Sequence, residues 1–74
     1  GKVVKLQQAI ISLLRSNPTV SYTVEEVANT LNVPDDVETT FKVLMHLSAN
    51  PDHKIKQLLP ANTPLVASRF QVAT

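Results

Sequence analysis

The sequence predicts a mainly α-helical domain with a small antiparallel β-sheet. Three observations lead to this class: an amphipathic segment at residues 2–16, two apolar stripes separated by a turn at residues 23–49, and two alternating segments after residue 53. Helical stripes repeat every three or four residues, whereas strands alternate every second residue. The 74 residues are predicted to form a single domain, residues 1–74, near the lower size limit for independent folding.

Composition excludes several classes of protein. The hydrophobic fraction of 43% is ordinary for a globular protein, so disorder is not expected. The chain has no cysteine, which excludes disulfides and thiolate metal sites and fits a reducing cytoplasm. No apolar run approaches the ~20 residues of a membrane-spanning helix, and no signal peptide is visible. We therefore predict a cytoplasmic protein without a membrane partner.

The first predicted helix covers residues 2–16 and ends at Asn17-Pro18. Its main apolar stripe contains Val3, Leu6, Ile10, Leu13 and Leu14. Val4 and Ile11 lie beside this stripe and widen the apolar arc. These two side chains either flank the core beneath the C-terminal strand or form a homodimer contact, because exposed β-branched residues on a terminal helix often pack on a partner.

A short edge strand is predicted at residues 20–22, followed by a second helix that Thr23 caps. Glu26, three residues later, completes a capping box, in which each residue bonds the backbone amide of the other. Glu25 and Glu26 also suit the positive end of this helix. Both acids are therefore interpreted as structural.

A turn at Asn32 and a third helix at about residues 34–49 follow. Asn32 stands where a left-handed backbone is often needed, and Asn or Gly fits that conformation best. Pro34 suits a first helical turn, where no amide donor is lost. The predicted apolar stripe of this helix is Val37, Phe41 and Leu44. The acids of its first turn, Asp35, Asp36 and Glu38, are expected to cap the helix and offset its dipole.

The C-terminal part is predicted to be a strand, a loop and a returning strand. In the first strand, Ile55 and Leu59 share one side. Residues 60–64 read Pro-Ala-Asn-Thr-Pro and are expected to form the hairpin loop. Residues 65–72 alternate again, with Phe70 among the inward side chains.

This order of elements resembles the winged-helix family. Small Ala28 at the helix crossing, Asn32 at the turn and Val33 in the corner between the helices carry the resemblance, which covers nearly the whole chain. The resemblance implies a three-helix core with a wing sheet of two or three strands. The side chains expected in the core with Phe41 and Leu44 are Leu6, Ile10, Leu13, Leu31 and Phe70.

Catalytic and metal-binding parts are lacking in the sequence. His46 and His53 have no cysteine near them, which makes a metal site improbable. The single glycine is Gly1, so no phosphate-cradling loop exists, and no serine has a plausible base partner. We therefore predict that the chain is not an enzyme and holds no cofactor and no metal.

The resemblance implies a DNA-binding module, as in small transcriptional regulators, with the third helix in the major groove of double-stranded DNA. The residues expected to contact DNA are Thr39, Lys42 and His46 on that helix and Lys54, Lys56 and Arg69 on the strands. Thr39 would touch a base edge, and the cations would contact phosphates. A homodimer through Val4 and Ile11 would suit a palindromic operator, and the location would then be the nucleoid or nucleus.

The alternative function is a protein–protein interaction module. The net charge is only +1, whereas DNA-binding domains usually carry a clear basic surplus. The predicted reading helix begins with Asp35, Asp36 and Glu38, which would be repelled by nearby phosphates. In this alternative those three acids bind a basic protein partner.

Overall fold

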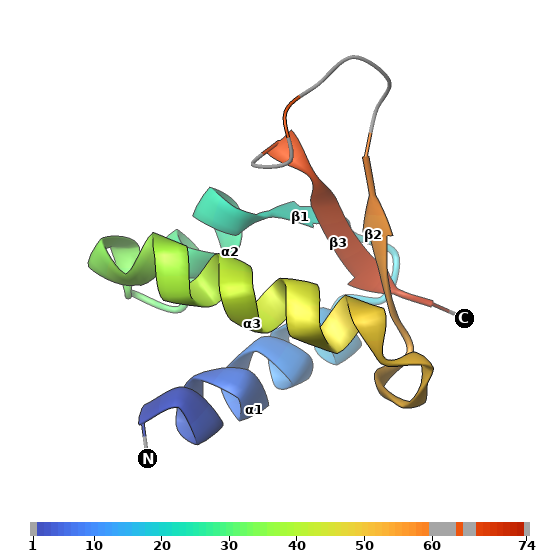
Figure 1. Cartoon of the computed structure of the whole chain (residues 1–74), viewed down its shortest axis with the longest axis horizontal. Coiled ribbons are helices and arrows are strands. Elements are labelled where there is room, and N and C mark those ends of the chain that lie inside the picture. Colours follow the sequence, from blue (N-terminus) through green and yellow to red (C-terminus); the bar gives the residue numbers. More distant parts are fainter. Residues whose placement is uncertain (1, 60–63, 65–66, 74) are drawn as a thin grey trace.

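A computed structural model describes residues 2–59, 64 and 67–73. Its helices and strands are α1 (Lys2–Ser16), β1 (Tyr22–Thr23), α2 (Val24–Thr30), α3 (Val37–Ala49), β2 (Ile55–Leu58) and β3 (Arg69–Val72) (Figure 1). Single 3₁₀ turns cover Pro34–Asp36 and Pro51–His53. The described elements therefore confirm a mainly helical class with a small antiparallel sheet. The predicted loop at residues 60–63 and the start of the returning strand at residues 65–66 lie outside the described residues.

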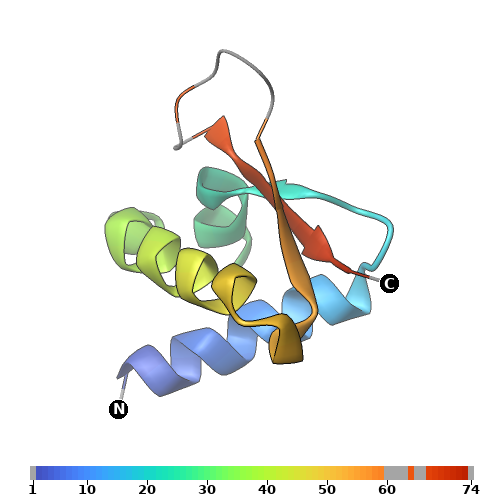
Figure 2. The ribbon, with the colours of Figure 1, turned by 45° about the vertical axis from the view of Figure 1, so that its right-hand side comes forward.

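The sheet has three antiparallel strands in the order β1-β3-β2. The last strand in sequence is thus the central one, and Phe70 pairs with Tyr22 on one side and with Gln57 on the other. Both views show the sheet beside the helices, with α1 crossing below α3 (Figure 1, Figure 2). The edge strand Tyr22–Thr23 begins two residues later than the prediction of residues 20–22 and overlaps it only at Tyr22.

Two local predictions are confirmed atom by atom. The Thr23 hydroxyl accepts a hydrogen bond from the Glu26 amide at 3.2 Å, and the Thr23 amide donates to Glu26 Oε1 at 2.8 Å. These bonds form the capping box of α2. Asn32 has a left-handed backbone with a φ of 61°. The bounds of α1 and the end of α3 before Asn50 also agree with prediction.

The core differs from its predicted composition. Ile10, Leu44 and Phe70 are fully buried as expected, together with Leu14, Val27 and Leu47. Phe41 is only partly buried and packs against the outside of this core, as do Leu6, Leu13 and Leu31. The aromatic side chain at the centre is Phe70.

The buried face of α3 explains this difference. It contains Thr40, Val43, Leu44 and Leu47, so it is displaced around the helix from the predicted stripe of Val37, Phe41 and Leu44. α3 packs against both α1 and β2 as well as α2. Apolar residues occupy both candidate faces of α3, and these neighbours determine which face is covered.

The acids before and at the start of α3 do not cap it as predicted. Asp36 precedes the helix but makes no side-chain capping bond, and Asp35 and Glu38 are exposed. The segment forms a 3₁₀ turn instead, in which the Asp36 amide donates to the Val33 carbonyl at 2.9 Å.

In β2, Ile55 is buried, but Leu59 lies beyond the end of the strand and is exposed. None of the helices in the described part of the chain is long and apolar enough to cross a membrane.

Candidate functional site

The residues predicted to contact DNA lie on three separate elements. Thr39, Lys42 and His46 are exposed on α3, as expected for one helix face. Lys54 is exposed immediately before β2, Lys56 is exposed within it, and Arg69 is half-buried at the start of β3. The first five residues are thus exposed, whereas Arg69 has a different environment.

Arg69 is engaged within the fold. Its Nε donates to Ser21 Oγ at 2.8 Å, and its terminal Nη2 donates to the Ser21 carbonyl at 2.9 Å. The same Nη2 forms an ion pair with Glu26 Oε1 at 3.1 Å. Arg69 therefore ties the central strand to the first turn of α2 and to the segment before β1.

Glu26 is the acidic centre of this connection. The hydrogen bond from the Thr23 amide lowers the pKa of Glu26 most, and the Arg69 charge and the Thr23 side chain lower it further, against an opposing effect of partial burial. Because the ion pair is largely exposed, water screens most of its energy. The cluster therefore acts as a cap and a tether for the fold.

Lys54 also has a backbone role that the sequence did not indicate. Its φ of 54° is left-handed, and its amide donates to the Pro51 carbonyl at 3.2 Å. Its own carbonyl accepts a hydrogen bond from the Ala73 amide at 2.6 Å. The residue therefore closes the 3₁₀ turn before β2 and holds the end of the chain beside it.

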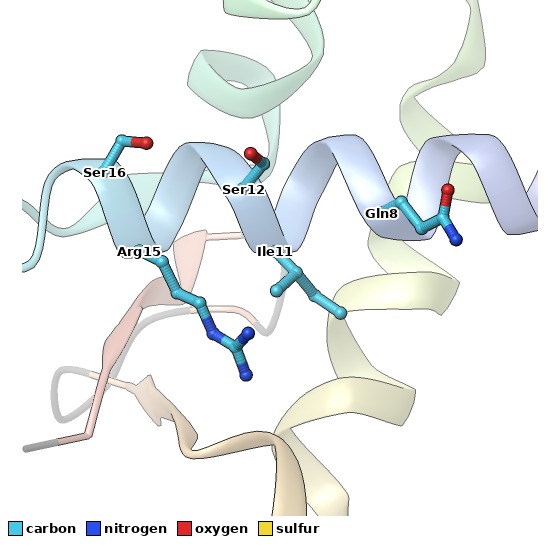
Figure 3. Close-up of a pocket in the computed structure, with 5 residues that line it drawn as sticks. All are labelled: Gln8, Ile11, Ser12, Arg15 and Ser16. Atoms are coloured by element: carbon cyan, nitrogen blue, oxygen red, sulfur yellow. The ribbon is translucent and has the colours of Figure 1, made fainter.

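The hollows on the described surface include three that lie along or between helices. The first follows the outer side of α1, has a volume of about 470 Å³, and is lined by Gln8, Ile11, Ser12, Arg15 and Ser16. Figure 3 shows these side chains fanning out from the helix, with Arg15 and Ser16 pointing to different sides. A binding site for a small molecule usually has polar groups that converge. This hollow lacks that arrangement.

The second hollow, here named the α1–turn groove, lies between the first half of α1 and the turn leading into α3. Its volume is about 590 Å³, and it is lined by Val3, Lys5, Leu6, Ala9, Leu31, Val33, Asp36 and Thr39. Most of these side chains are apolar, while Lys5, Asp36 and Thr39 supply the polar ones. No local sequence pattern indicates this groove, because its walls come from segments more than 20 residues apart in the chain.

The third hollow lies between α2 and α3 and has a volume of about 440 Å³. Val24, Val37 and Phe41 form its apolar part, and Glu25 and Glu38 supply its acids. Phe41 thus lines a surface hollow rather than filling the core. Within residues 2–59, 64 and 67–73, no three His, Asp or Glu side chains are placed to hold a metal ion.

The proteins to which this chain is similar are enzymes, not transcriptional regulators. They are glucose-6-phosphate isomerases. The chain is 51% identical over 55 residues to the protein of Citrifermentans bemidjiense, covering 74% of this chain and 10% of that isomerase. It is 33% identical over 73 residues to the protein of Desulfitobacterium hafniense, covering 99% of this chain and 13% of that isomerase.

A plant protein is similar as well. Glucose-6-phosphate isomerase 1, chloroplastic, of Arabidopsis thaliana is 32% identical over 54 residues, covering 68% of this chain and 9% of the plant protein. The chain thus spans only about a tenth of the length of the curated relatives that it matches. No protein-family model and no solved structure matches it.

These similarities overturn the predicted family and function. The relatives are named as isomerases, so membership of a DNA-binding winged-helix family, the regulatory function and the double-stranded DNA partner are wrong. The predicted interaction module with a basic protein partner is therefore wrong as well. The predicted homodimer loses its basis, because it was suggested by palindromic DNA operators. An arrangement of helices and strands does not by itself fix function, which explains the error.

The prediction that the chain is not an enzyme is likewise corrected, because the relatives are enzymes. That prediction rested on the lack of a catalytic constellation within 74 residues. Such a lack carries no information about the remaining nine-tenths of an isomerase of the relatives' length.

Proposed function

We propose that this chain is a segment of a glucose-6-phosphate isomerase, an enzyme that isomerises glucose 6-phosphate. The observation that carries the proposal is the match to the Desulfitobacterium hafniense isomerase, which extends over 99% of the chain. The 51% identity to the Citrifermentans bemidjiense isomerase supports it over three-quarters of the chain. Chance similarity rarely combines such identity with such coverage of the shorter sequence.

Within the enzyme, we propose that residues 1–74 form one folded unit. The core supports this, since side chains from all three helices meet β2 and β3 in a single cluster that includes Ile10, Leu44, Ile55 and Phe70. The Arg69–Glu26 pair joins elements 43 residues apart in the chain. We therefore propose a structural role for the segment within the isomerase.

The finer architecture is also a proposal. A helix, an edge strand, two helices and two further strands in the order β1-β3-β2 support a winged-helix arrangement. In this proposal the arrangement packs the helices and strands of a small unit around one core and has no role in binding DNA. The cytoplasmic location inferred from the lack of cysteine stays a prediction, and the nucleoid or nuclear alternative is withdrawn with the DNA-binding hypothesis.

The proposal is tested with the complete polypeptide that contains this segment. The expected result is steady isomerisation of glucose 6-phosphate by the complete polypeptide and none by the isolated 74-residue chain at equal concentration. The isolated chain is the matched control, because it has the same core and surface. A complete polypeptide of isomerase length with no activity on glucose 6-phosphate would refute the proposal.

A further inference from the structure

The α1–turn groove continues onto exposed apolar surface at the start of α1. Val3 lines the groove and is 54% exposed. Single exposed apolar side chains are normal on a protein surface, but a groove with an apolar floor and an exposed apolar margin indicates an interaction site. Burying such side chains contributes about 25 cal/mol per Å² of apolar surface removed from water.

We propose that the α1–turn groove is the docking surface for an apolar segment of the same isomerase polypeptide, lying outside residues 1–74. This inference rests on the proposed function. The match to the Desulfitobacterium hafniense isomerase covers 99% of this chain but only 13% of that enzyme. The remainder of such a polypeptide is long enough to supply a docking segment, and the groove is larger than the other two hollows.

The side chains of the groove define the chemistry of its occupant. Leu6, Ala9, Leu31 and Val33 accept branched or aromatic side chains. Lys5 and Asp36 are exposed on the same groove and carry opposite charges. The occupant is therefore an amphipathic segment whose apolar side chains fill the floor, with an acid facing Lys5 and a base facing Asp36.

The position of the groove leaves the sheet undisturbed. Both overall views place the first turns of α1 on the side away from β2 and β3 (Figure 1, Figure 2). The hollow along α1 is a poorer docking surface, because Ile11 is the one apolar residue among those that line it and its polar neighbours fan out (Figure 3). The occupant can therefore reach the α1–turn groove without displacing any described strand.

Photo-crosslinking in the complete polypeptide tests this assignment. A benzophenone side chain is placed at Val3, and in a control protein at Val20, which is 42% exposed in the connection between α1 and β1. After irradiation, mass spectrometry of the digest should show Val3 joined to an apolar segment outside residues 1–74 of the same chain. The control should give at most one-tenth of that product.

Three outcomes would overturn the docking surface: crosslinks between two polypeptides, crosslinks confined to residues 1–74, or equal yields at both positions. Isomerase activity of the unlabelled polypeptide is measured first. An inactive polypeptide counts against the proposed function. An active isomerase without the specific Val3 product counts against the docking surface alone.

A second readout uses the same pair of positions. In the complete polypeptide, Val3→Asp should accelerate amide hydrogen exchange in the first half of α1 roughly tenfold, because a charge would face the docked segment. Val20→Asp should leave that exchange unchanged. Equal exchange in the Val3→Asp variant and the parent polypeptide would overturn the inference.

Discussion

Thr40 places a hydroxyl among apolar side chains at the centre of the fold. The residue is fully buried on α3, and its Oγ1 has no hydrogen-bond partner among the described residues. A buried polar atom without a partner costs about 1–3 kcal/mol. We expect Thr40→Val to raise the free energy of unfolding by about 1 kcal/mol, since it removes that cost and keeps the branched shape.

Urea unfolding of the polypeptide that carries the segment measures this effect. Thr40→Ala is the control, because it also removes the hydroxyl but leaves a cavity, and it should lower stability. A Val variant less stable than the parent would show that the hydroxyl is satisfied.

Lys54 is the second residue where a local cost is visible. A left-handed backbone costs a residue with a Cβ roughly 1–2 kcal/mol, and Lys54 has a φ of 54°. We expect Lys54→Gly to raise the free energy of unfolding by about 0.5 kcal/mol, after the greater freedom of glycine in the unfolded chain is deducted. Lys56→Gly, in β2, should instead lower it by about 0.5–1 kcal/mol. If both variants destabilise equally, Lys54 is not strained.

At the scale of elements, the capping box of α2 gives a pH dependence with a definite sign. The pKa of Glu26 is lowered in the folded state, mainly by the hydrogen bond from the Thr23 amide. The unfolded chain therefore binds the proton more readily. The stabilising contribution is fully present above the ordinary glutamate pKa of 4.5 and is lost as the pH falls through the lower folded value.

Unfolding measured between pH 6 and pH 3 tests this sign. The parent protein should lose stability in the acid range more steeply than Glu26→Gln does. Glu25→Gln, on the same turn but outside the capping box, should keep the steepness of the parent. A Glu26→Gln curve that runs parallel to the parent curve would contradict the account.

Local structure that depends on residues close in the chain could be predicted from the sequence. Structure that depends on packing between distant elements could not. The capping box and the left-handed Asn32 depend on residues at most three positions apart, so their residue types are sufficient signals. The left-handed Lys54 gave no such signal, because lysine is not a residue typical of that backbone. The buried face of α3 depended on where α1 and β2 lie, which no local pattern specifies.

The α1–turn groove could not be predicted from the sequence for a related reason. Leu6 and Val33 each resemble ordinary core residues, and only the folded arrangement brings them to one hollow with an exposed margin. The function had no local signal either. The helix-turn-helix pattern indicates how the helices pack. That packing is compatible with a segment of an enzyme as well as with a DNA-binding protein.

At the scale of the whole molecule, the described residues form a unit with its own core, and under the proposed function its activity belongs to a longer polypeptide. The core joins all three helices to the sheet, and Arg69 fixes the central strand to α2. The relatives are about ten times as long as the matched region. Under the proposed function, isomerisation is a property of the polypeptide that contains the segment.

Immunodepletion tests this central claim most directly. An antibody raised against the 74-residue chain is used to capture its native polypeptide from an extract of the source cells, and the isomerisation of glucose 6-phosphate is measured before and after capture. We predict that the captured polypeptide is several times longer than 74 residues and that activity leaves the extract in proportion to it. A captured polypeptide of only 74 residues, with all the isomerase activity left in the extract, would contradict the account.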